Sequence, residues 1–361
     1  MFFYMPTKIY AEKNAVHAHA SELCALGKNA LIVTGRSSAE KNGSLTDVTD
    51  ALKKGGVTYA HFNEVEENPS IETVMKARDI GIAEGCDFCI GIGGGSPMDA
   101  AKAIAVMMDR RDETEGFLYD ASRAVTKALP LALIPTTCGT GSESTPYSIL
   151  TRHALKTKAA IPHKIFADLS LIDGKYLRTA PAHILLDTTT DALAHLFESF
   201  INVRATDYSK LCVYQGLKLW QRSQKILSEG ARSATDDDLF NMLNTSMIAG
   251  MAISHTGTSL PHGLSYAVTY ATGMPHGKAC GYFLPGYLRE ADAEQATEVL
   301  QMAGFADTDA LERYYEDTCG RDAVAKEILE RAVADIMENE GKRTQPPFPV
   351  DEPLLRRVVG I

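Results

Sequence analysis

The chain has 361 residues, which suffices for two domains at roughly 100–200 residues per domain. Apolar residues make up 45% and charged residues 23%, close to the averages of soluble globular proteins, so the composition excludes a disordered chain. The 36 Lys and Arg against 46 Asp and Glu leave a formal net charge of −10, which repels the phosphates of nucleic acids and of anionic membranes. We therefore expect neither nucleic acid nor a membrane as a partner.

The cysteines and the apolar runs bear on the compartment. Seven cysteines, an odd number with little clustering, are typical of reduced thiols in the cytosol. Cys86 and Cys89 form a CxxC pair at the start of an apolar run, and we expect core thiols there rather than a redox or metal pair. No apolar run reaches the ~18–20 residues of a membrane span, and the first residues lack the pattern of a secretory leader. These features predict a cytoplasmic protein.

In chain order, the first half alternates short apolar runs with helical patterns, which is typical of a parallel sheet with crossover helices. Strands are predicted at 30–34, 57–62, 87–92 and 131–135, and helices at 44–55 and 71–85. After residue 181 the chain changes to amphipathic helical stretches, at 184–203, 207–229, 236–256, 291–303 and 323–339. We therefore predict an α/β domain of nucleotide-binding size over 1–180 and a helical domain over 181–361.

Two polar loops follow predicted strands. In the first, Gly93, Gly94 and Gly95 allow close approach of the backbone to a bound group, and Ser96-Pro97 suits the cap and first turn of a helix whose free N–H groups attract an anion. The second is the stretch Pro-Thr-Thr-Cys-Gly-Thr-Gly-Ser-Glu-Ser-Thr at 135–145. The first loop is not the GxGxxG fingerprint, and a glycine-rich turn can be purely structural. Because the carboxyl ends of parallel strands converge on the ligand crevice, the two loops together favour a nucleotide site.

The helical half carries a pattern of metal-ligand residues. Asp191 and His195 are four residues apart, so one helix face presents a carboxylate and an imidazole to the same point, although such a pair alone is commonly a surface hydrogen bond. Two Pro-His-Gly triplets add His262 and His276. Three imidazoles and one carboxylate suit Fe(II) or Zn(II), whereas Mg(II) and Ca(II) prefer oxygen ligands.

Together these segments resemble the iron-containing, metal-dependent (group III) alcohol dehydrogenase family. The matching residues are Gly93-Gly-Gly-Ser-Pro-Met-Asp99, the stretch 135–143, Asp191-Ala-Leu-Ala-His195, and His262 with His276. The resemblance implies a dehydroquinate synthase-like architecture, with a Rossmann-like α/β domain that binds NAD(P), an all-α metal-binding domain, and the site in the cleft between them. It also implies a homodimer or a larger homo-oligomer.

The resemblance assigns roles to individual residues. It implies that Asp191, His195, His262 and His276 are the metal ligands. It places the diphosphate and ribose at Gly94, Gly95, Ser96 and Asp99, with Thr136, Thr137 and Thr140 lining the cofactor from the second loop. Lys158 matches a position near the nicotinamide ribose, and Asn68 one near the adenosine end.

The chain departs from the family pattern at two places. Members that prefer NAD tend to have an Asp after the first strand, but here the strand ends at Gly35, a cofactor-binding candidate, and Arg36, Ser37 and Ser38 follow, which can donate to a 2′-phosphate. We therefore predict NADP(H) over NAD(H), the alternative being a solvated turn. Many members carry a further His where this chain has Tyr266, whose hydroxyl relays a proton or whose ring shapes the pocket.

The implied reaction is reversible hydride transfer between NADP(H) and a small primary alcohol or aldehyde, or a diol. Within the superfamily the alternatives are a polyol or sugar-phosphate dehydrogenase, such as a glycerol dehydrogenase, and a dehydroquinate synthase. A non-catalytic nucleotide-binding protein would not need the metal ligands, and a metallohydrolase would not need the cofactor loops.

Overall fold

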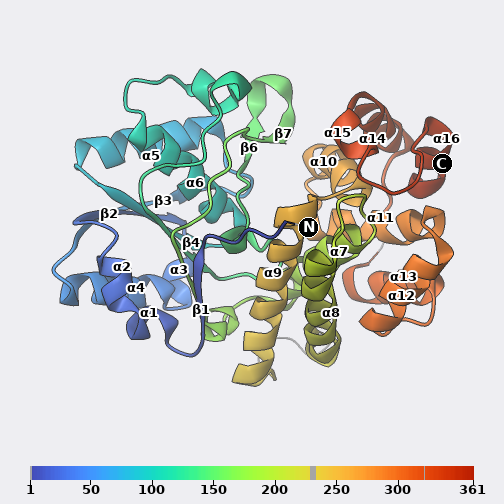
Figure 1. The fold of residues 1–361 in the computed structure, drawn as a ribbon, viewed down its shortest axis with the longest axis horizontal. Helices are drawn as coiled ribbons and strands as arrows, with labels where there is room; N and C mark the ends of the chain where they lie inside the picture. The colour runs from blue at the N-terminus through green and yellow to red at the C-terminus, as the bar shows by residue number, and fades with distance from the viewer. Residues whose placement is uncertain (1, 228–232, 321) are drawn as a thin grey trace.

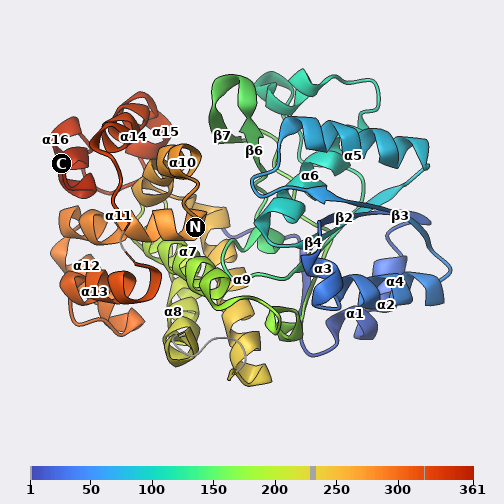
Figure 2. The same ribbon diagram turned by 180° about the vertical axis from the view of Figure 1, so that it is seen from behind.

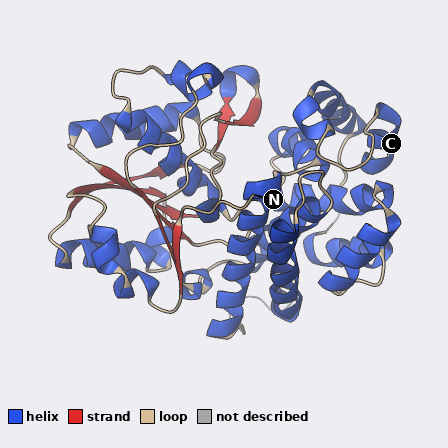
Figure 3. Cartoon of the chain, viewed as in Figure 1, coloured by secondary structure: helices blue, strands red, loops and turns tan. Residues whose placement is uncertain are grey.

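The computed structural model describes residues 2–227, 233–320 and 322–361. One half of the molecule holds the strands with the helices that cover them, and the other half is helical (Figures 1 and 3). Among the described residues, no helix has the length and apolar character needed to cross a bilayer.

The central sheet has six parallel strands in the order β1-β8-β5-β4-β2-β3. Its strands are β1 (Lys8–Ala11), β2 (Asn29–Gly35), β3 (Thr58–Val65), β4 (Phe88–Gly93), β5 (Leu131–Pro135) and β8 (Leu169–Ile172). The four predicted strands are confirmed as β2, β3, β4 and β5. The sequence analysis did not predict β1 and β8, because a strand of four residues is too short to show a clear alternation of apolar and polar residues. It also did not predict the antiparallel hairpin formed by β6 (Ile149–Arg152) and β7 (Thr157–Ala160).

Helices cover both faces of this sheet (Figure 2). On one face lie α1 (Ala15–Ala18), α2 (Ala20–Cys24) and α4 (Ser44–Lys54), and on the other α5 (Ile71–Ala83) and α6 (Gly95–Asp109); the short α3 (Ser38–Lys41) follows β2. Side chains alternate along β2, with Ala30 and Ile32 in one core and Leu31 and Val33 in the other, as the period of a strand requires. Cys86 and Cys89 are both buried free thiols, in agreement with a place in the core.

The helical half is built around one buried helix, α7, in which every residue from Thr189 to Phe200 is buried. Its helices are α7 (Ala182–Phe200), α8 (Asp207–Leu227), α9 (Asp236–Thr256), α10 (Leu260–Thr272), α11 (His276–Glu290), α12 (Ala293–Ala303), α13 (Thr308–Cys319), α14 (Lys326–Glu338), α15 (Glu340–Arg343) and α16 (Glu352–Val359). The five predicted helices correspond to α7, α8, α9, α12 and α14; predicted positions 228 and 229 lie outside the described residues. The sequence did not predict α10 and α11, since each begins at a Pro-His-Gly triplet whose proline and glycine obscure the helical pattern.

Candidate metal centre and cofactor cleft

A cleft of about 990 Å³ is lined by the loops after β2, β4 and β5 and by α7, α10 and α11. It brings together most of the predicted site residues: Gly35, Ser38, Asn68, Gly94, Gly95, Ser96, Asp99, Thr137, Thr140, Lys158, Asp191, His195, His262, Tyr266 and His276. Three predicted residues are not on its lining. Arg36 and Ser37 are exposed beside Gly35, and Thr136 is buried, with its N–H donating to the Gly93 carbonyl at 2.8 Å.

The glycine-rich turn packs directly on the second loop. A Cβ on Gly95 would lie 2.7 Å from Thr140 Cγ2, and one on Gly94 would lie 3.0 Å from Thr137 Oγ1. Gly93 has φ +151°, which side-chain-bearing residues rarely adopt. The expectation that Ser96 caps the following helix is wrong: α6 begins at Gly95 with Gly94 as its cap, because the glycines let the chain enter the helix at once. The Ser96 hydroxyl instead accepts from the Asn68 N–H at 3.0 Å.

A buried lysine and an aspartate hold the second loop in place. The Lys102 side chain is fully buried, and its ammonium donates to the Ser142 carbonyl, the Ser142 hydroxyl and the Tyr147 carbonyl, each at 2.7 Å. Burial lowers the pKa of Lys102 to about 8. Asp99 accepts from the Ser142 hydroxyl at 2.6 Å and from the Ile149 N–H at 2.8 Å. Asp99, predicted near the diphosphate and ribose, therefore also supports the loop.

Asn68 and Lys158, far apart in the sequence, contact each other across the cleft wall. The Lys158 ammonium donates to Asn68 Oδ1 at 2.6 Å, and Asn68 has a left-handed backbone with φ 59°. Burial lowers the pKa of Lys158.

The four predicted metal ligands converge on one point. Asp191 and His195 lie one turn apart on α7, His262 is in the first turn of α10, and His276 is the first residue of α11. From Asp191 Oδ1 the Nε2 atoms lie at 3.9 Å for His195, 3.3 Å for His262 and 3.9 Å for His276. Ligand bonds of about 2.0–2.2 Å in a tetrahedral site would separate the donors by about 3.3–3.6 Å, so the group is close to the size of a metal site.

The chemistry of this group fits a cation. Asp191 Oδ1 and His262 Nε2 are buried, and among the described residues neither has a hydrogen-bond partner. A buried polar atom without a partner is costly, and a divalent ion between these two atoms would satisfy both.

Hydrogen bonds orient each imidazole with Nε2 toward the centre. His195 Nδ1 lies 3.2 Å from the Gly139 carbonyl, and His262 Nδ1 contacts the fully buried Glu198 carboxylate. His276 Nδ1 lies 3.3 Å from the Ser265 hydroxyl, which itself donates to the His262 carbonyl at 2.8 Å. Each contact places the ring proton on Nδ1 and leaves the Nε2 lone pair free for a metal.

Burial and charge set the protonation of the ligands. Burial lowers the pKa of His195 to about 4 and the pKa of His276 well below its usual range, so both rings are neutral at pH 7. Burial alone would raise the pKa of Asp191, but the three imidazoles outweigh it and hold this pKa below the usual range. Asp191 therefore remains a carboxylate.

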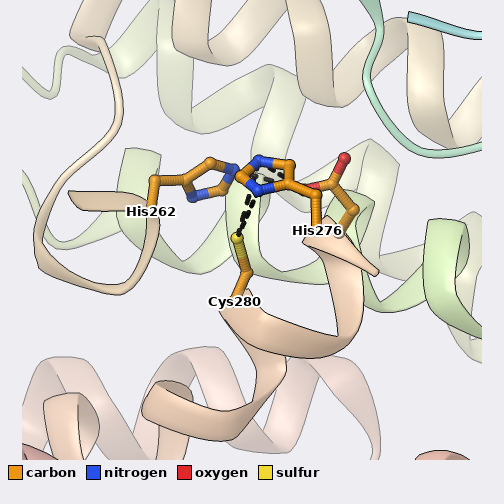
Figure 4. A group of neighbouring side chains, drawn as sticks. His262, His276 and Cys280 are labelled. Carbon is orange, nitrogen blue, oxygen red and sulfur yellow. Dashed lines mark hydrogen bonds and ion pairs between the residues drawn. The ribbon is translucent and has the colours of Figure 1, made fainter. Parts of the chain in front are cut away.

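Two further residues of this site, Glu198 and Cys280, were not assigned a role from the sequence. Cys280 lies one turn after His276 on α11, with Sγ 3.8 Å from His276 Nε2, and Figure 4 shows it beside His262 and His276. One donor atom from each of Cys280, Asp191, His262 and His276 lies within 4.8 Å of the other three. Spacing could have revealed both residues: Glu198 lies seven after Asp191, and Cys280 lies four after His276, each on the same helix face.

The glycine of the second Pro-His-Gly triplet has a packing role. A Cβ on Gly277 would lie 1.9 Å from the Asp187 carbonyl and 2.9 Å from Asp191 Cβ. Only glycine lets α11 approach α7 closely enough to bring His276 to Asp191.

Tyr266 lies beside the donor group. Its ring stacks on His276, with centroids 5.8 Å apart and planes 17° apart. Burial raises the pKa of Tyr266 to about 12, so its hydroxyl is protonated at neutral pH.

Sequence comparison shows the class to which this fold and site belong. The family model for iron-containing alcohol dehydrogenases matches residues 6–174, and the model for the C-terminal domain of that family matches residues 185–338. The chain belongs to the iron-containing alcohol dehydrogenase family and is an oxidoreductase.

Individual named relatives and a solved structure agree with this family assignment. A solved iron-containing alcohol dehydrogenase of Thermotoga maritima superposes with a TM-score of 0.90 at 34% identity, over 100% of this chain and 99% of that one. Long-chain-alcohol dehydrogenase 1 of Geobacillus thermodenitrificans is 27% identical over 93% of this chain and 90% of its own length. Sulfoacetaldehyde reductase of Bilophila wadsworthia is 30% identical over 78% of this chain and 72% of its own length.

Proposed function

We propose that this enzyme transfers a hydride between NADP(H) and a small primary alcohol or aldehyde, or a diol, with Fe(II) or Zn(II) held by Asp191, His195, His262 and His276. One observation carries the proposal: a single cleft joins the two glycine-containing loops to a group of nitrogen and oxygen donors, two of which are buried and have no hydrogen-bond partner in the described part of the chain. The α/β half at 1–180 would bind the cofactor and the helical half at 181–361 the metal.

When bound, a divalent ion in this site polarises a carbonyl and stabilises an alkoxide, and the nicotinamide accepts or supplies the hydride. Three neutral imidazoles and one carboxylate leave such an ion a net charge of about +1, which favours a developing alkoxide. Glu198, Ser265 and the Gly139 carbonyl hold the rings in the tautomer that binds the ion. Tyr266 covers one face of His276 and thereby shapes the pocket.

The preference for NADP(H) rests on the turn after β2. Arg36, Ser37 and Ser38 are exposed there, and no carboxylate in this stretch repels a 2′-phosphate. Replacing Arg36 by Ala removes a charge-assisted hydrogen bond of about 1.5–3 kcal/mol, so the KM for NADPH is expected to rise roughly ten- to a hundredfold while the KM for NADH stays unchanged. Lys41→Ala, a nearby exposed cation, is the matched control. Equal effects of Arg36→Ala on both cofactors would refute the assignment.

The proposed activity is tested by the loss of reduced-nicotinamide absorbance with a panel of aldehydes, with NADPH against NADH, on protein loaded with Fe(II) or Zn(II). Small aldehydes should be reduced, and NADPH should be the better cofactor. Activity only with polyols or sugar phosphates would favour the alternative dehydrogenases. Absence of turnover with every substrate and both cofactors would refute the proposal.

A further inference from the structure

Two lysines from opposite walls of the cleft approach the same aromatic ring. Lys158 lies on β7 and Lys342 on α15, and each ammonium is 5.9 Å from the centroid of the Tyr266 ring. That ring stacks on His276, one of the proposed metal ligands. The two positive charges therefore lie one side chain away from the place where the reacting carbon must be.

Among the described residues, the ammonium of Lys342 makes no hydrogen bond to a carboxylate. Its ammonium donates to the Thr258 carbonyl at 3.1 Å and to the Thr258 hydroxyl at 2.6 Å, which leaves one of its three N–H groups without a partner among the described residues. Within the same set of residues, no carboxylate forms an ion pair with Lys342 or Lys158. Burial lowers the pKa of Lys342, and the charge of Glu198 opposes this shift only in part.

Glu198, the carboxylate whose charge acts on Lys342, is already hydrogen-bonded to other groups. One of its oxygens contacts His262 Nδ1, and the other accepts from the backbone N–H groups of Ser259 at 2.9 Å and His262 at 3.1 Å. The stem of Lys342 passes over Gly263, next to His262, where a Cβ on Gly263 would lie 3.4 Å from Lys342 Cγ. This path keeps the ammonium at the cleft, whose lining includes Lys342.

Arg331, a second cation on the helical wall of the cleft, has a carboxylate neighbour. Arg331 on α14 lines the same cleft, but its side chain is 59% exposed and lies 3.9 Å from Asp335. Lys342 thus differs from Arg331 in being less exposed, in packing beside His262, and in having no carboxylate in contact within the described part of the chain.

We propose that Lys342, assisted by Lys158, recognises an anionic group on the substrate, so that the preferred substrates are short aldehydes, or the corresponding alcohols, that carry a carboxylate or phosphate at the end remote from the reacting carbon. This specificity rests on the proposed dehydrogenase function and gives it a substrate class.

The test compares aldehydes with and without an anionic group on the metal-loaded enzyme. Succinate semialdehyde is paired with the isostere in which an isopropyl group replaces the carboxylate, and glycolaldehyde phosphate with glycolaldehyde. For at least one pair, the wild-type kcat/KM is expected to be higher for the anionic member, and the pair that shows it distinguishes carboxylate from phosphate recognition. Lys342→Met should lower that ratio by about ten- to a hundredfold, the loss of one hydrogen bond to a charged group.

Two further variants separate recognition from a structural role. Lys342→Arg should retain most of the preference, and Arg331→Met should leave it unchanged; the metal content and melting temperature of each variant show that the site is intact. Equal kcat/KM values for both members of each pair in the wild type, or an unaltered preference in Lys342→Met, would overturn the inference while leaving the dehydrogenase function standing. If the wild type turned over none of these aldehydes nor any in the wider panel, the proposed function itself would fail, and this inference with it.

Discussion

The replacement of Glu198 by Gln should weaken metal binding, although Glu198 touches no metal in the proposed site. The side chain lies fully buried on α7 and faces three N–H groups: His262 Nδ1 on one oxygen, and the backbone N–H groups of Ser259 and His262 on the other. A carboxylate accepts on both sides, whereas an amide has one accepting oxygen and one donating NH₂. In either orientation, the Gln NH₂ would therefore face an N–H group.

The magnitude follows from this mismatch. A buried donor left without a partner costs about 1–3 kcal/mol of folding free energy. Removing the partner of a metal-binding histidine typically lowers metal affinity about ten- to a hundredfold, or about 1.4–2.7 kcal/mol. If the NH₂ faces Nδ1, the ring proton moves to Nε2 and occupies the lone pair that faces Asp191, so we expect the upper end of this range.

The assay is Zn(II) affinity by competition with a chelator, with thermal denaturation of the metal-free protein to measure folding separately. Glu352→Gln is the control, since that carboxylate pairs with Arg356 on the exposed surface of α16, with its own side chain 54% exposed. A Glu198→Gln variant with wild-type Zn(II) affinity would refute the assignment of His262 as a ligand oriented by Glu198.

Two other predictions concern the same half of the site and the loop that faces it. His195→Ala should lower metal affinity by roughly tenfold or more, because the Nε2 lone pair of His195 is already free to bind an ion. Cys280→Ser should retain most of the metal affinity, because burial raises the pKa of the Cys280 thiol and disfavours the thiolate that would bind the ion. The metal content of each variant is measured after dialysis against a chelator, and a larger loss in Cys280→Ser than in His195→Ala would make the sulfur a ligand. Burial raises the pKa of Glu143 to about 7, above its ordinary value of 4.5, so the folded state binds this proton more tightly than the unfolded state does. The free energy of unfolding should therefore fall by up to about 3 kcal/mol as the pH rises from 4.5 to 7. Glu143→Gln should abolish this fall in denaturant-unfolding curves between pH 4.5 and 8, and a parallel pH dependence in both proteins would contradict the burial argument.

Much of the architecture was accessible from local pattern. The four longer strands and seven of the helices, α4, α5, α7, α8, α9, α12 and α14, follow from apolar periodicity, which acts over a few residues and needs no knowledge of partners. The pairing of Asp191 with His195 follows from the pitch of one helix. The cap of α6 was misplaced by two residues, because the close packing of Gly94 and Gly95 on Thr137 and Thr140 is a tertiary contact that the turn residues alone do not reveal.

The sequence by itself determined the family, the two glycine-containing loops and the four candidate metal ligands, because each is a pattern of neighbouring residues. Only the tertiary structure decided which groups surround them. Glu198 meets His262 across 64 residues of chain, and Lys342 meets Thr258 across 84. These contacts depend on how α7, α10 and α15 pack, and packing is fixed by the whole core rather than by any segment. That packing brings an oriented imidazole and a lysine that contacts no carboxylate of the described residues to a single cleft.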